Sequence, residues 1–366
     1  MVKISYIEIT ARVNYPTEGQ PQLHLWEPTL QTLSTQTFKD FEYIVVDVFY
    51  EERPDYFKTH NYGLQIKHVP AAPNIWHELG MVQTCHQFNK GIIHADGELI
   101  FTGADSSMYP PDLMENLWCH YKNGYFVSLG FGADLTYVTK LKKDEWQGMA
   151  LPDAPTQIIP TSWYDFGYDG FVVMDHRFRS LFENNEKQNS TIPPEWYYGI
   201  STVSLEAALK INGYDEAFDG DSTVNDVDFG TRLAMAGYNN IAMFRDSYTV
   251  EAYAKPQSWH PKMKRPEIKC NNGILLYNKV TGKYRANQPL YLDIDYIINT
   301  VCKRICPVRD KCATLPHRGP FYNKNEKKLF EYWREHGATF QMDLEFEREM
   351  RIDKDDYLEG TYVNVQ

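Results

Sequence analysis

The first hundred residues alternate between two patterns of hydrophobic positions. Residues 26–37 and 75–94 carry apolar side chains three and four positions apart, which predicts amphipathic helices. Around them lie segments with the apolar and β-branched patterns of strands: residues 3–13, 41–48, 64–69 and 98–102. Strands that alternate with helices predict a mostly parallel sheet with right-handed crossovers. Because ligands bind beyond the carboxyl ends of such strands, the residues directly after each strand are candidates for function.

Length and composition narrow the class of protein. The chain has 366 residues, of which 43% are hydrophobic, 14% aromatic and 23% charged, and this is a globular composition. The length predicts one domain of roughly 200–250 residues with an appendage. No apolar run approaches the roughly 18–20 residues of a membrane helix, and residues 1–7 lack the features of a signal peptide. We therefore expect a soluble, cytoplasmic protein without a membrane partner, located in the host cytoplasm if the chain is viral.

The charges are segregated along the chain. The formal net charge is −12, yet residues 261–328 hold 15 Lys and Arg against 5 Asp and Glu. The acidic remainder of the chain excludes a protein that contacts nucleic acid over its whole surface. The basic segment is a candidate contact for a polyanion. The alternative is that this segment is a solvated surface that balances an acidic face.

Four motifs, in order, resemble those of family 2 glycosyltransferases with the GT-A fold. They are residues 29–47 (TLQTLSTQTFKDFEYIVVD), 89–100 (NKGIIHADGELI), 212–218 (NGYDEAF) and 225–233 (NDVDFGTRL). The resemblance covers about residues 3–245 and implies an α/β, Rossmann-like nucleotide-diphospho-sugar transferase fold. We expect a GT-A domain at residues 1–260, and a basic, Cys-containing C-terminal extension at residues 261–366. The implied activity is inverting, metal-dependent transfer of a hexose from a nucleotide sugar, expected to be a UDP-sugar, to a hydroxyl group.

The resemblance also implies a metal site. Charge on a leaving diphosphate is usually neutralised by Mg²⁺ or Mn²⁺ held by carboxylates. Asp105 stands at the second position of the family's D-x-D motif, whereas Gly103 replaces the first Asp. His260 is a candidate second ligand, because some GT-A enzymes recruit a histidine just after the core domain. The alternatives are that Asp105 caps the following turn and that His260 is structural.

The nucleotide is expected at the ends of the first two strands. Asp47 corresponds to an Asp that hydrogen-bonds uracil in family members, and its alternative role is a cap of the strand end. Thr10 and Arg12 follow the first strand, where the backbone and side chains of family members surround the nucleotide base. Arg12 is also placed to approach the diphosphate. Asn89, in the second motif, is also assigned to nucleotide binding, while Phe88 replaces a family arginine.

The resemblance assigns the general base to Asp226, which would deprotonate the acceptor hydroxyl. Asn225 replaces the family Glu, which reduces like-charge repulsion beside Asp226. Asp226 has the alternative role of a carboxylate that interacts with a helix dipole. Asp228 and Arg232 are expected to form a structural ion pair, and Asp228 or Asp219 is next in line as base.

Four of the six cysteines lie in the C-terminal third: Cys270, Cys302, Cys306 and Cys312. Three thiols within eleven residues predict a structural zinc site at residues 270–312, with an iron–sulfur cluster or ordinary buried thiols as alternatives. Basic residues surround these cysteines. If this segment lies beside the catalytic crevice, its positive charge favours a polyanionic acceptor.

The acceptor has more than one interpretation. GT-A enzymes of this kind are encoded by phages that glycosylate hydroxymethylated DNA bases, so DNA is the slightly favoured acceptor. A glycan or lipid-linked sugar is the alternative. Because Gly103 and Phe88 depart from the family pattern, a degenerate protein that binds nucleotide sugars without transfer is a further alternative. Trp196, Tyr197 and Tyr198 are expected to form an aromatic wall for sugar or acceptor, or to belong to the core.

Overall fold

The computed structural model of the protein describes most of the N-terminal two thirds of the chain and parts of the rest. The described residues are 2–11, 26–71, 84–105, 107–134, 156–158, 171–174, 189–197, 200–219, 224–251, 275, 278–286 and 343–352. No helix among them is both long and apolar enough to cross a membrane.

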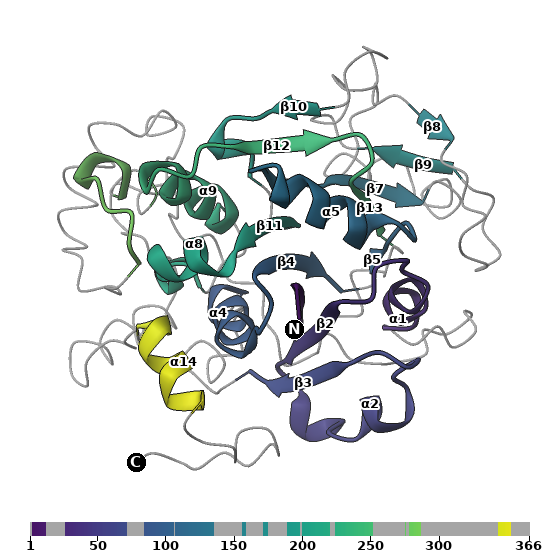
Figure 1. Cartoon of the computed structure of the whole chain (residues 1–366). Coiled ribbons are helices and arrows are strands. Elements are labelled where there is room, and N and C mark those ends of the chain that lie inside the picture. Colours follow the sequence, from purple (N-terminus) through teal and green to yellow (C-terminus); the bar gives the residue numbers. More distant parts are fainter. Residues whose placement is uncertain are drawn as a thin grey trace, which may run out of the picture.

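A five-stranded sheet with the order β11-β4-β1-β2-β3 forms the centre of the molecule (Figure 1). Its strands are β1 (Ile4–Thr10), β2 (Phe41–Asp47), β3 (Ile66–Pro70), β4 (Leu99–Ala104) and β11 (Ser201–Ser204). β4, β1, β2 and β3 run parallel, and β11 is antiparallel to β4. Thr10 is paired with Asp47, and Ile9 with Ala104, so three strands end at one edge of the sheet. The predicted mixed α/β architecture with a mostly parallel sheet is therefore confirmed.

Helices cover both faces of this sheet. The helices of the described part are α1 (Glu27–Ser34), α2 (Tyr56–Thr59), α4 (Thr84–His94), α5 (Leu113–Lys122), α8 (Leu205–Lys210), α9 (Asn225–Met235) and α14 (Leu344–Ile352). Single turns of 3₁₀ helix occur at η1 (Tyr50–Glu52), η3 (Pro194–Trp196) and η4 (Glu216–Phe218). Helices were predicted over 26–37 and 75–94; α1 and α4 lie within these ranges, and residues 75–83 lie outside the described part.

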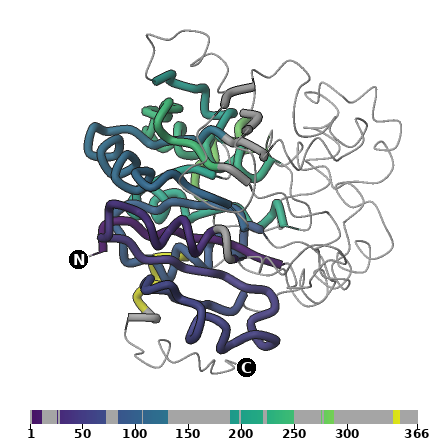
Figure 2. The backbone as a smooth tube through the Cα atoms, turned by 90° about the vertical axis from the view of Figure 1, so that its right-hand side faces the viewer, coloured from purple at the N-terminus to yellow at the C-terminus, as the bar shows by residue number. Residues whose placement is uncertain are grey.

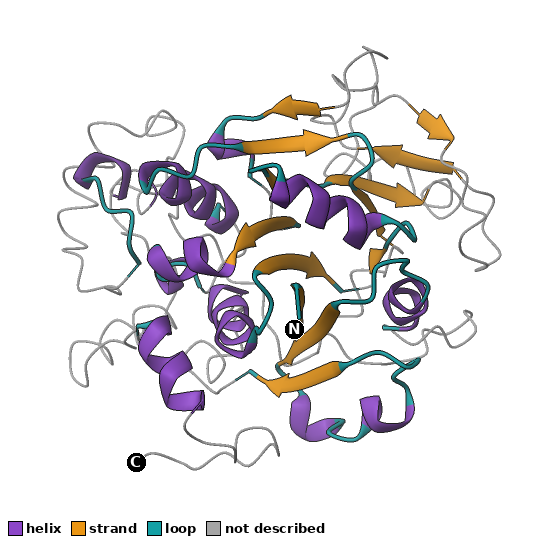
Figure 3. Ribbon diagram, in the orientation of Figure 1, coloured by secondary structure: helices purple, strands orange, loops and turns teal. Residues whose placement is uncertain are grey.

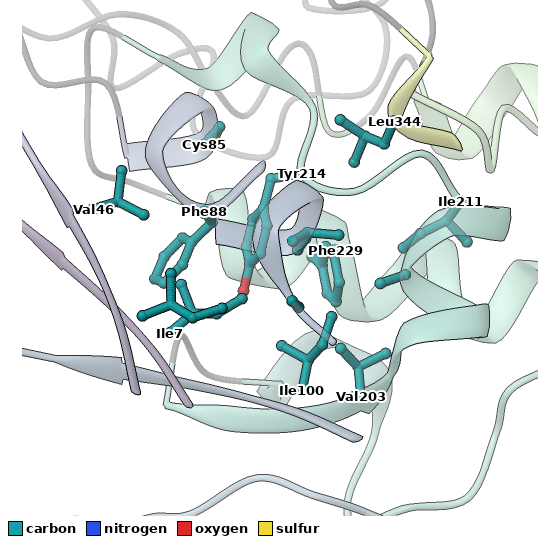
Figure 4. Packing of buried hydrophobic residues seen from close by; sticks show 14 of the residues in the cluster. Ile7, Val46, Cys85, Phe88, Ile100, Val203, Ile211, Tyr214, Phe229 and Leu344 are labelled. Carbon is teal, nitrogen blue, oxygen red and sulfur yellow. The ribbon is translucent and has the colours of Figure 1, made fainter. Parts of the chain in front are cut away.

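The alternation of side chains along β1 divides the core into two clusters. Ile7 faces the cluster that includes α4 and α9, whereas Tyr6 faces the cluster that includes α1 and α5. Figure 4 shows the first cluster, where Tyr214 stacks on Phe88 at 4.8 Å and on Phe229 at 4.1 Å between ring centroids. Tyr214 therefore joins α4 to α9.

Two smaller sheets, which the sequence pattern did not predict, lie beyond α5 (Figure 3). One has the order β10-β12-β6, formed by Asn189–Thr191, Ile241–Phe244 and Phe126–Val127. The other has the order β5-β13-β7-β9-β8, formed by Ser107–Met108, Tyr248–Glu251, Gly130–Asp134, Phe171–Met174 and Thr156–Ile158. Strands from residues 107 and 248 thus meet, so chain segments far apart in sequence build this side of the molecule.

The C-terminal helix α14 packs against α4, as the yellow segment in Figure 2 shows. Lys90 on α4 pairs with Glu347 at 3.0 Å. The backbone N–H of Leu344 donates to Asn212 Oδ1 at 2.8 Å, and Arg348 donates to the carbonyl of Ile93 at 3.1 Å. Part of the predicted C-terminal extension is therefore in direct contact with the predicted GT-A domain.

Candidate functional site

Polar residues from three strands meet at the carboxyl edge of the central sheet. Thr10 ends β1, Asp47 ends β2, and Asp105 follows β4. Thr10 Oγ1 donates to Asp105 Oδ2 at 3.1 Å. From the first turn of α4, Gln87 Nε2 donates to the carbonyl of Thr10 at 3.0 Å. The parallel topology thus brings together Thr10, Asp47 and Asp105, all of which the sequence assigned to the donor site.

The space at Gly103 explains why the first carboxylate of the D-x-D motif is missing. A Cβ atom at this position would lie 2.4 Å from Tyr6 Cε2 and 2.8 Å from Tyr109 Oη. These two tyrosines are buried, and their hydroxyl oxygens are 2.6 Å apart. Since a tightly packed core resists added atoms, residue 103 has no room for an Asp side chain.

A second carboxyl group nevertheless lies near Asp105. Glu8 on β1 is paired in register with Gly103 on β4, and its side chain is fully buried. Tyr6 Oη donates to Glu8 Oε2 at 3.1 Å. Burial raises the pKa of Glu8 well above its usual value, and the nearby charge of Asp105 raises it further. Sequence analysis did not select Glu8, because an isolated Glu in a predicted buried strand carries no motif.

Asp47 is enclosed by hydrogen-bond donors. Arg53 binds both of its carboxylate oxygens, from Nε at 2.6 Å and from Nη2 at 2.7 Å. His68 Nε2 lies 3.0 Å from Oδ2, and the backbone N–H of Phe49 donates to Oδ1 at 2.9 Å. Burial alone would raise the pKa of Asp47, but the hydrogen bonds and charges of Arg53 and His68 hold it below the usual value. Asp47 is therefore an ionised carboxylate inside the fold.

Asn89 fastens α4 to the loop before η4. Its Nδ2 donates to the carbonyl of Tyr214 at 2.9 Å and to Glu216 Oε1 at 3.0 Å. Its Oδ1 accepts the backbone N–H of Tyr214 at 2.8 Å. These contacts link two of the family-like motifs to each other, and the predicted role of Asn89 in nucleotide binding stays a prediction.

The candidate base Asp226 lies in the first turn of α9. The residue before this helix, Val224, has a left-handed backbone with φ of 56°, and Asp226 Oδ1 accepts the N–H of Val227 at 2.8 Å. Asp226 is partly exposed. Burial is the main cause of the raised pKa values of Tyr197 and Tyr214, and the charge of Asp226 adds to both. Asp226 is thus near the residue that joins α4 to α9.

The predicted ion pair between Asp228 and Arg232 is confirmed. Arg232 Nε donates to Asp228 Oδ2 at 2.6 Å, and both side chains are buried. Asn278 Nδ2 donates to Asp228 Oδ1 at 2.8 Å, so a residue of the predicted extension completes this network. Arg232 also donates to the carbonyls of Ile211 at 3.0 Å and Gly213 at 2.9 Å.

Sequence analysis missed a buried cluster at the start of α4. Asp219, named only as a reserve base, accepts the N–H groups of Cys85 at 2.7 Å and His86 at 3.0 Å. Burial, followed by the charge of Glu216, raises the pKa of Asp219 to about 7. His86 Nδ1 lies 3.3 Å from Glu216 Oε2, which is an ion pair when His86 is protonated. The partners are more than 120 residues apart, so no local pattern indicates them.

The three consecutive aromatic residues at 196–198 do not share one environment. Tyr197 is buried in the core, Trp196 is 46% exposed, and Tyr198 lies outside the described residues. The turn η3 packs on α9 at Gly230, where a Cβ atom would lie 2.3 Å from Tyr197 Cβ. Trp196 is therefore an exposed aromatic on a segment that contacts the helix of Asp226.

Several predicted ligands lie outside the described residues: Arg12, His260, Cys270, Cys302, Cys306 and Cys312. Within the described part, no three His, Cys, Asp or Glu side chains are grouped so as to hold a metal ion. The predicted zinc site and the second metal ligand accordingly stay predictions.

Two described residues of the basic segment have acidic partners within the chain. Lys279 Nζ lies 2.9 Å from Glu195 Oε1. Arg285 pairs with Asp343 and donates to the carbonyl of Leu209 at 3.1 Å. These contacts are those of a segment that packs on the rest of the protein.

Comparison with known proteins gives structural neighbours only. No family model matches the chain, and no curated protein matches it. Similar solved structures include S. aureus TarS 1–349 in complex with UDP, at 13% identity and a TM-score of 0.47, over 99% of this chain and 93% of that chain. The same protein in complex with UDP-GlcNAc has 11% identity and a TM-score of 0.49, over 99% and 93%. These values assign the chain to no family; it is a mixed α/β protein whose candidate site lies at the carboxyl edge of a mainly parallel sheet.

Proposed function

We propose that the protein is a glycosyltransferase that uses a nucleotide sugar and inverts the configuration at the anomeric carbon of the transferred sugar. The observation that carries this proposal is the convergence of Thr10, Asp47 and Asp105 on one edge, where α/β sheets bind ligands. The motifs quoted above support it, because all four lie in elements that contact this edge or belong to or contact the helix of Asp226. UDP is the nucleotide expected from the resemblance.

A divalent cation fits the residues at the end of β4. Mg²⁺ is commonly held by one or two carboxylates together with substrate phosphates and water, so a site of few protein ligands is chemically sufficient. Asp105 and the hydroxyl of Thr10 offer oxygen atoms of the required kind. The ion would neutralise charge that develops on the leaving diphosphate. Asp105→Ala should therefore remove the effect of Mn²⁺ on the affinity for UDP. Calorimetry with and without Mn²⁺ measures this affinity, and a variant that binds UDP with Mn²⁺ as tightly as wild type would contradict this role.

Asp226 is proposed to take the proton of the acceptor hydroxyl. It is partly exposed at the start of α9, whereas Asp228 is buried against Arg232. Asn225 beside it adds no negative charge that would repel the carboxylate. Trp196, exposed on the turn that packs against α9, offers an apolar surface for a sugar ring.

The acceptor is proposed to be a hydroxyl group of a larger molecule. The hydroxymethyl group of a DNA base is the acceptor predicted from the charge segregation, and a glycan or lipid-linked sugar is the alternative. Lys279 and Arg285 are paired with acidic residues of the chain itself, so a DNA contact through these two residues would have to compete with those pairs.

The decisive experiment has two stages. UDP- and GDP-sugars are incubated with the protein and Mn²⁺, and release of free sugar is measured. Slow hydrolysis supports an enzyme, whereas binding of nucleotide without hydrolysis or transfer supports the degenerate alternative. The active donor is then offered hydroxymethylcytosine DNA, unmodified DNA and glycan acceptors, and the products are analysed by mass. No added hexose mass on DNA with any donor would eliminate the DNA acceptor.

A further inference from the structure

The contacts of Asp47 bear on how a nucleobase is held. An ionised carboxylate has two oxygens with about four lone-pair positions and no proton to donate. Oδ1 accepts from Phe49 N and Arg53 Nη2, and Oδ2 accepts from Arg53 Nε and faces His68 Nε2. Because Asp47 is ionised, His68 must donate from Nε2. All four positions are thus occupied by groups of the chain itself.

Access to Asp47 is closed as well. Its side chain is 0% exposed, and that of His68 is 8% exposed. The Tyr50 and His68 rings are 4.6 Å apart, and the Phe57 ring lies 4.9 Å from His68, which fixes the imidazole. An N–H group of a base would therefore have to displace a donor from a buried, charge-assisted pair.

Arg53 retains hydrogen-bonding capacity at the same place. A guanidinium carries five N–H groups, of which Asp47 uses one on Nε and one on Nη2, so three remain on Nη1 and Nη2. In the described part of the chain, no acceptor is recorded for Nη1. The guanidinium carbon lies 4.4 Å from the centroid of the Trp26 ring, and the side chain is 10% exposed. The two hydrogen bonds to Asp47 and the stacking over the Trp26 ring hold the guanidinium in one orientation.

Arg53 binds the residue that ends β2, two strands away from Asp105 along the carboxyl edge of the sheet. Asp105, Thr10 and Asp47 end the neighbouring strands β4, β1 and β2. Neighbouring strands are about 4.8 Å apart, so Asp105 and Asp47 are separated by about 10 Å along the edge. With the diphosphate at Asp105, a nucleoside that follows this edge brings its base to the end of β2.

We propose that Arg53, oriented by Asp47, is the residue that donates hydrogen bonds to the base of the donor nucleotide, and that Asp47 itself does not contact the base. This inference rests on the proposed function and identifies a residue that determines nucleotide specificity. Uracil offers two carbonyl oxygens on either side of N3–H, and these are the acceptors that Arg53 requires. Asp47 is then a positioning residue.

Calorimetry with Mn²⁺ tests the inference on the full chain, with UDP, N3-methyl-UDP and inorganic pyrophosphate as probes. Wild-type protein should bind N3-methyl-UDP within about threefold of UDP, because Asp47, whose lone pairs are occupied, does not accept from N3–H. Arg53→Gln should lower the affinity for UDP at least about tenfold, equivalent to 1.4 kcal/mol, and leave the affinity for pyrophosphate unchanged. Arg53→Lys should be as weak as Arg53→Gln, because an ammonium lacks the planar fork. Lys58→Gln, on the exposed side of α2, is the matched control.

Double substitution separates positioning from contact. Asp47→Asn should weaken the binding of UDP. The double variant Asp47→Asn/Arg53→Gln should bind UDP no more weakly than Arg53→Gln alone, because the two residues act as a unit. A loss above tenfold on N3 methylation, wild-type UDP affinity in Arg53→Gln, or restored affinity in Arg53→Lys would each overturn the inference. Absence of any UDP binding to wild-type protein would overturn the proposed function, and the inference with it.

Discussion

The carboxyl edge of the sheet and the first turns of α9 each combine two carboxylates in the same way. In each region one Asp is buried against an arginine: Asp47 with Arg53, and Asp228 with Arg232. The other Asp is less deeply buried: Asp105 is a buried residue at 7% exposure and accepts from Thr10, and Asp226 is partly exposed. A buried charge without a partner is strongly destabilising, so the buried members must be paired. The comparison separates carboxylates that maintain the fold from those proposed for chemistry.

The two buried pairs differ in what surrounds them. Four donors enclose Asp47, and its pKa is lowered despite burial. Burial raises the pKa of Asp228 and Asp215 raises it further, although Arg232 and Asn278 oppose this. Asp228 is thus the more weakly compensated charge. The two pairs thus differ in the number of hydrogen-bond donors around the carboxylate as well as in the direction of its pKa shift.

The largest expected effect separates Asp226 from Asp228. Asp226→Asn should lower transfer by about 10²–10⁴-fold, which is the usual contribution of a general base. Nucleotide affinity should be unchanged, because a base acts in the chemical step. Turnover assays and calorimetry on the same preparation check both statements. Wild-type turnover in this variant would move the base to Asp228 or Asp219.

The next effect concerns stability. Arg232→Met leaves Asp228 buried without its cation and should cost about 3–5 kcal/mol in the free energy of unfolding. Chemical denaturation measures this, with Asp226→Ala as the control that should change stability little. If both variants are equally stable, the buried pair does not maintain the fold.

A smaller loss is expected at Gly103. Gly103→Asp restores the family motif but forces atoms against Tyr6 and Tyr109, which should destabilise the protein by about 1–3 kcal/mol. Thermal unfolding with and without Mn²⁺ measures the change. Full stability together with tighter Mn²⁺ binding would show that the site has room for a second carboxylate on β4.

The smallest effect is a change in pH dependence at Asp219. Its folded pKa of about 7 exceeds the value of about 3.9 in unfolded chains, so its contribution to stability is present below pH 3.9 and is lost as pH rises toward 7. The charge of His86 and hydrogen bonds keep the pKa of Glu216 lowered against the effect of burial, which has the opposite effect on stability. The charge of Glu216 raises the pKa of His86 against the effect of burial, and this acts on stability in the same direction as Asp219. Asp219→Asn should make stability rise more clearly between pH 4 and 7 in denaturation experiments; an unchanged slope would contradict the raised pKa.

Local patterns in the sequence were sufficient for much of the fold. Buried runs predicted the strands that became β1, β2, β3 and β4, because strand and helix periodicities are properties of a few consecutive residues. The four-residue spacing of Asp228 and Arg232 on a predicted helix likewise indicated their ion pair, since such residues are neighbours on one helix face.

Tertiary structure decided what each polar residue does. The sequence placed Asp47 after a strand, but only folding brought Arg53 and His68 onto its two oxygens. The absence of a side chain at residue 103 was visible in the sequence, whereas its cause, the packed hydroxyls of Tyr6 and Tyr109, was not. The contacts of Asp219 with α4 and of Asn278 with α9 likewise join residues distant in sequence. Periodicity determines which elements form, but the partners of a buried charge depend on how those elements pack.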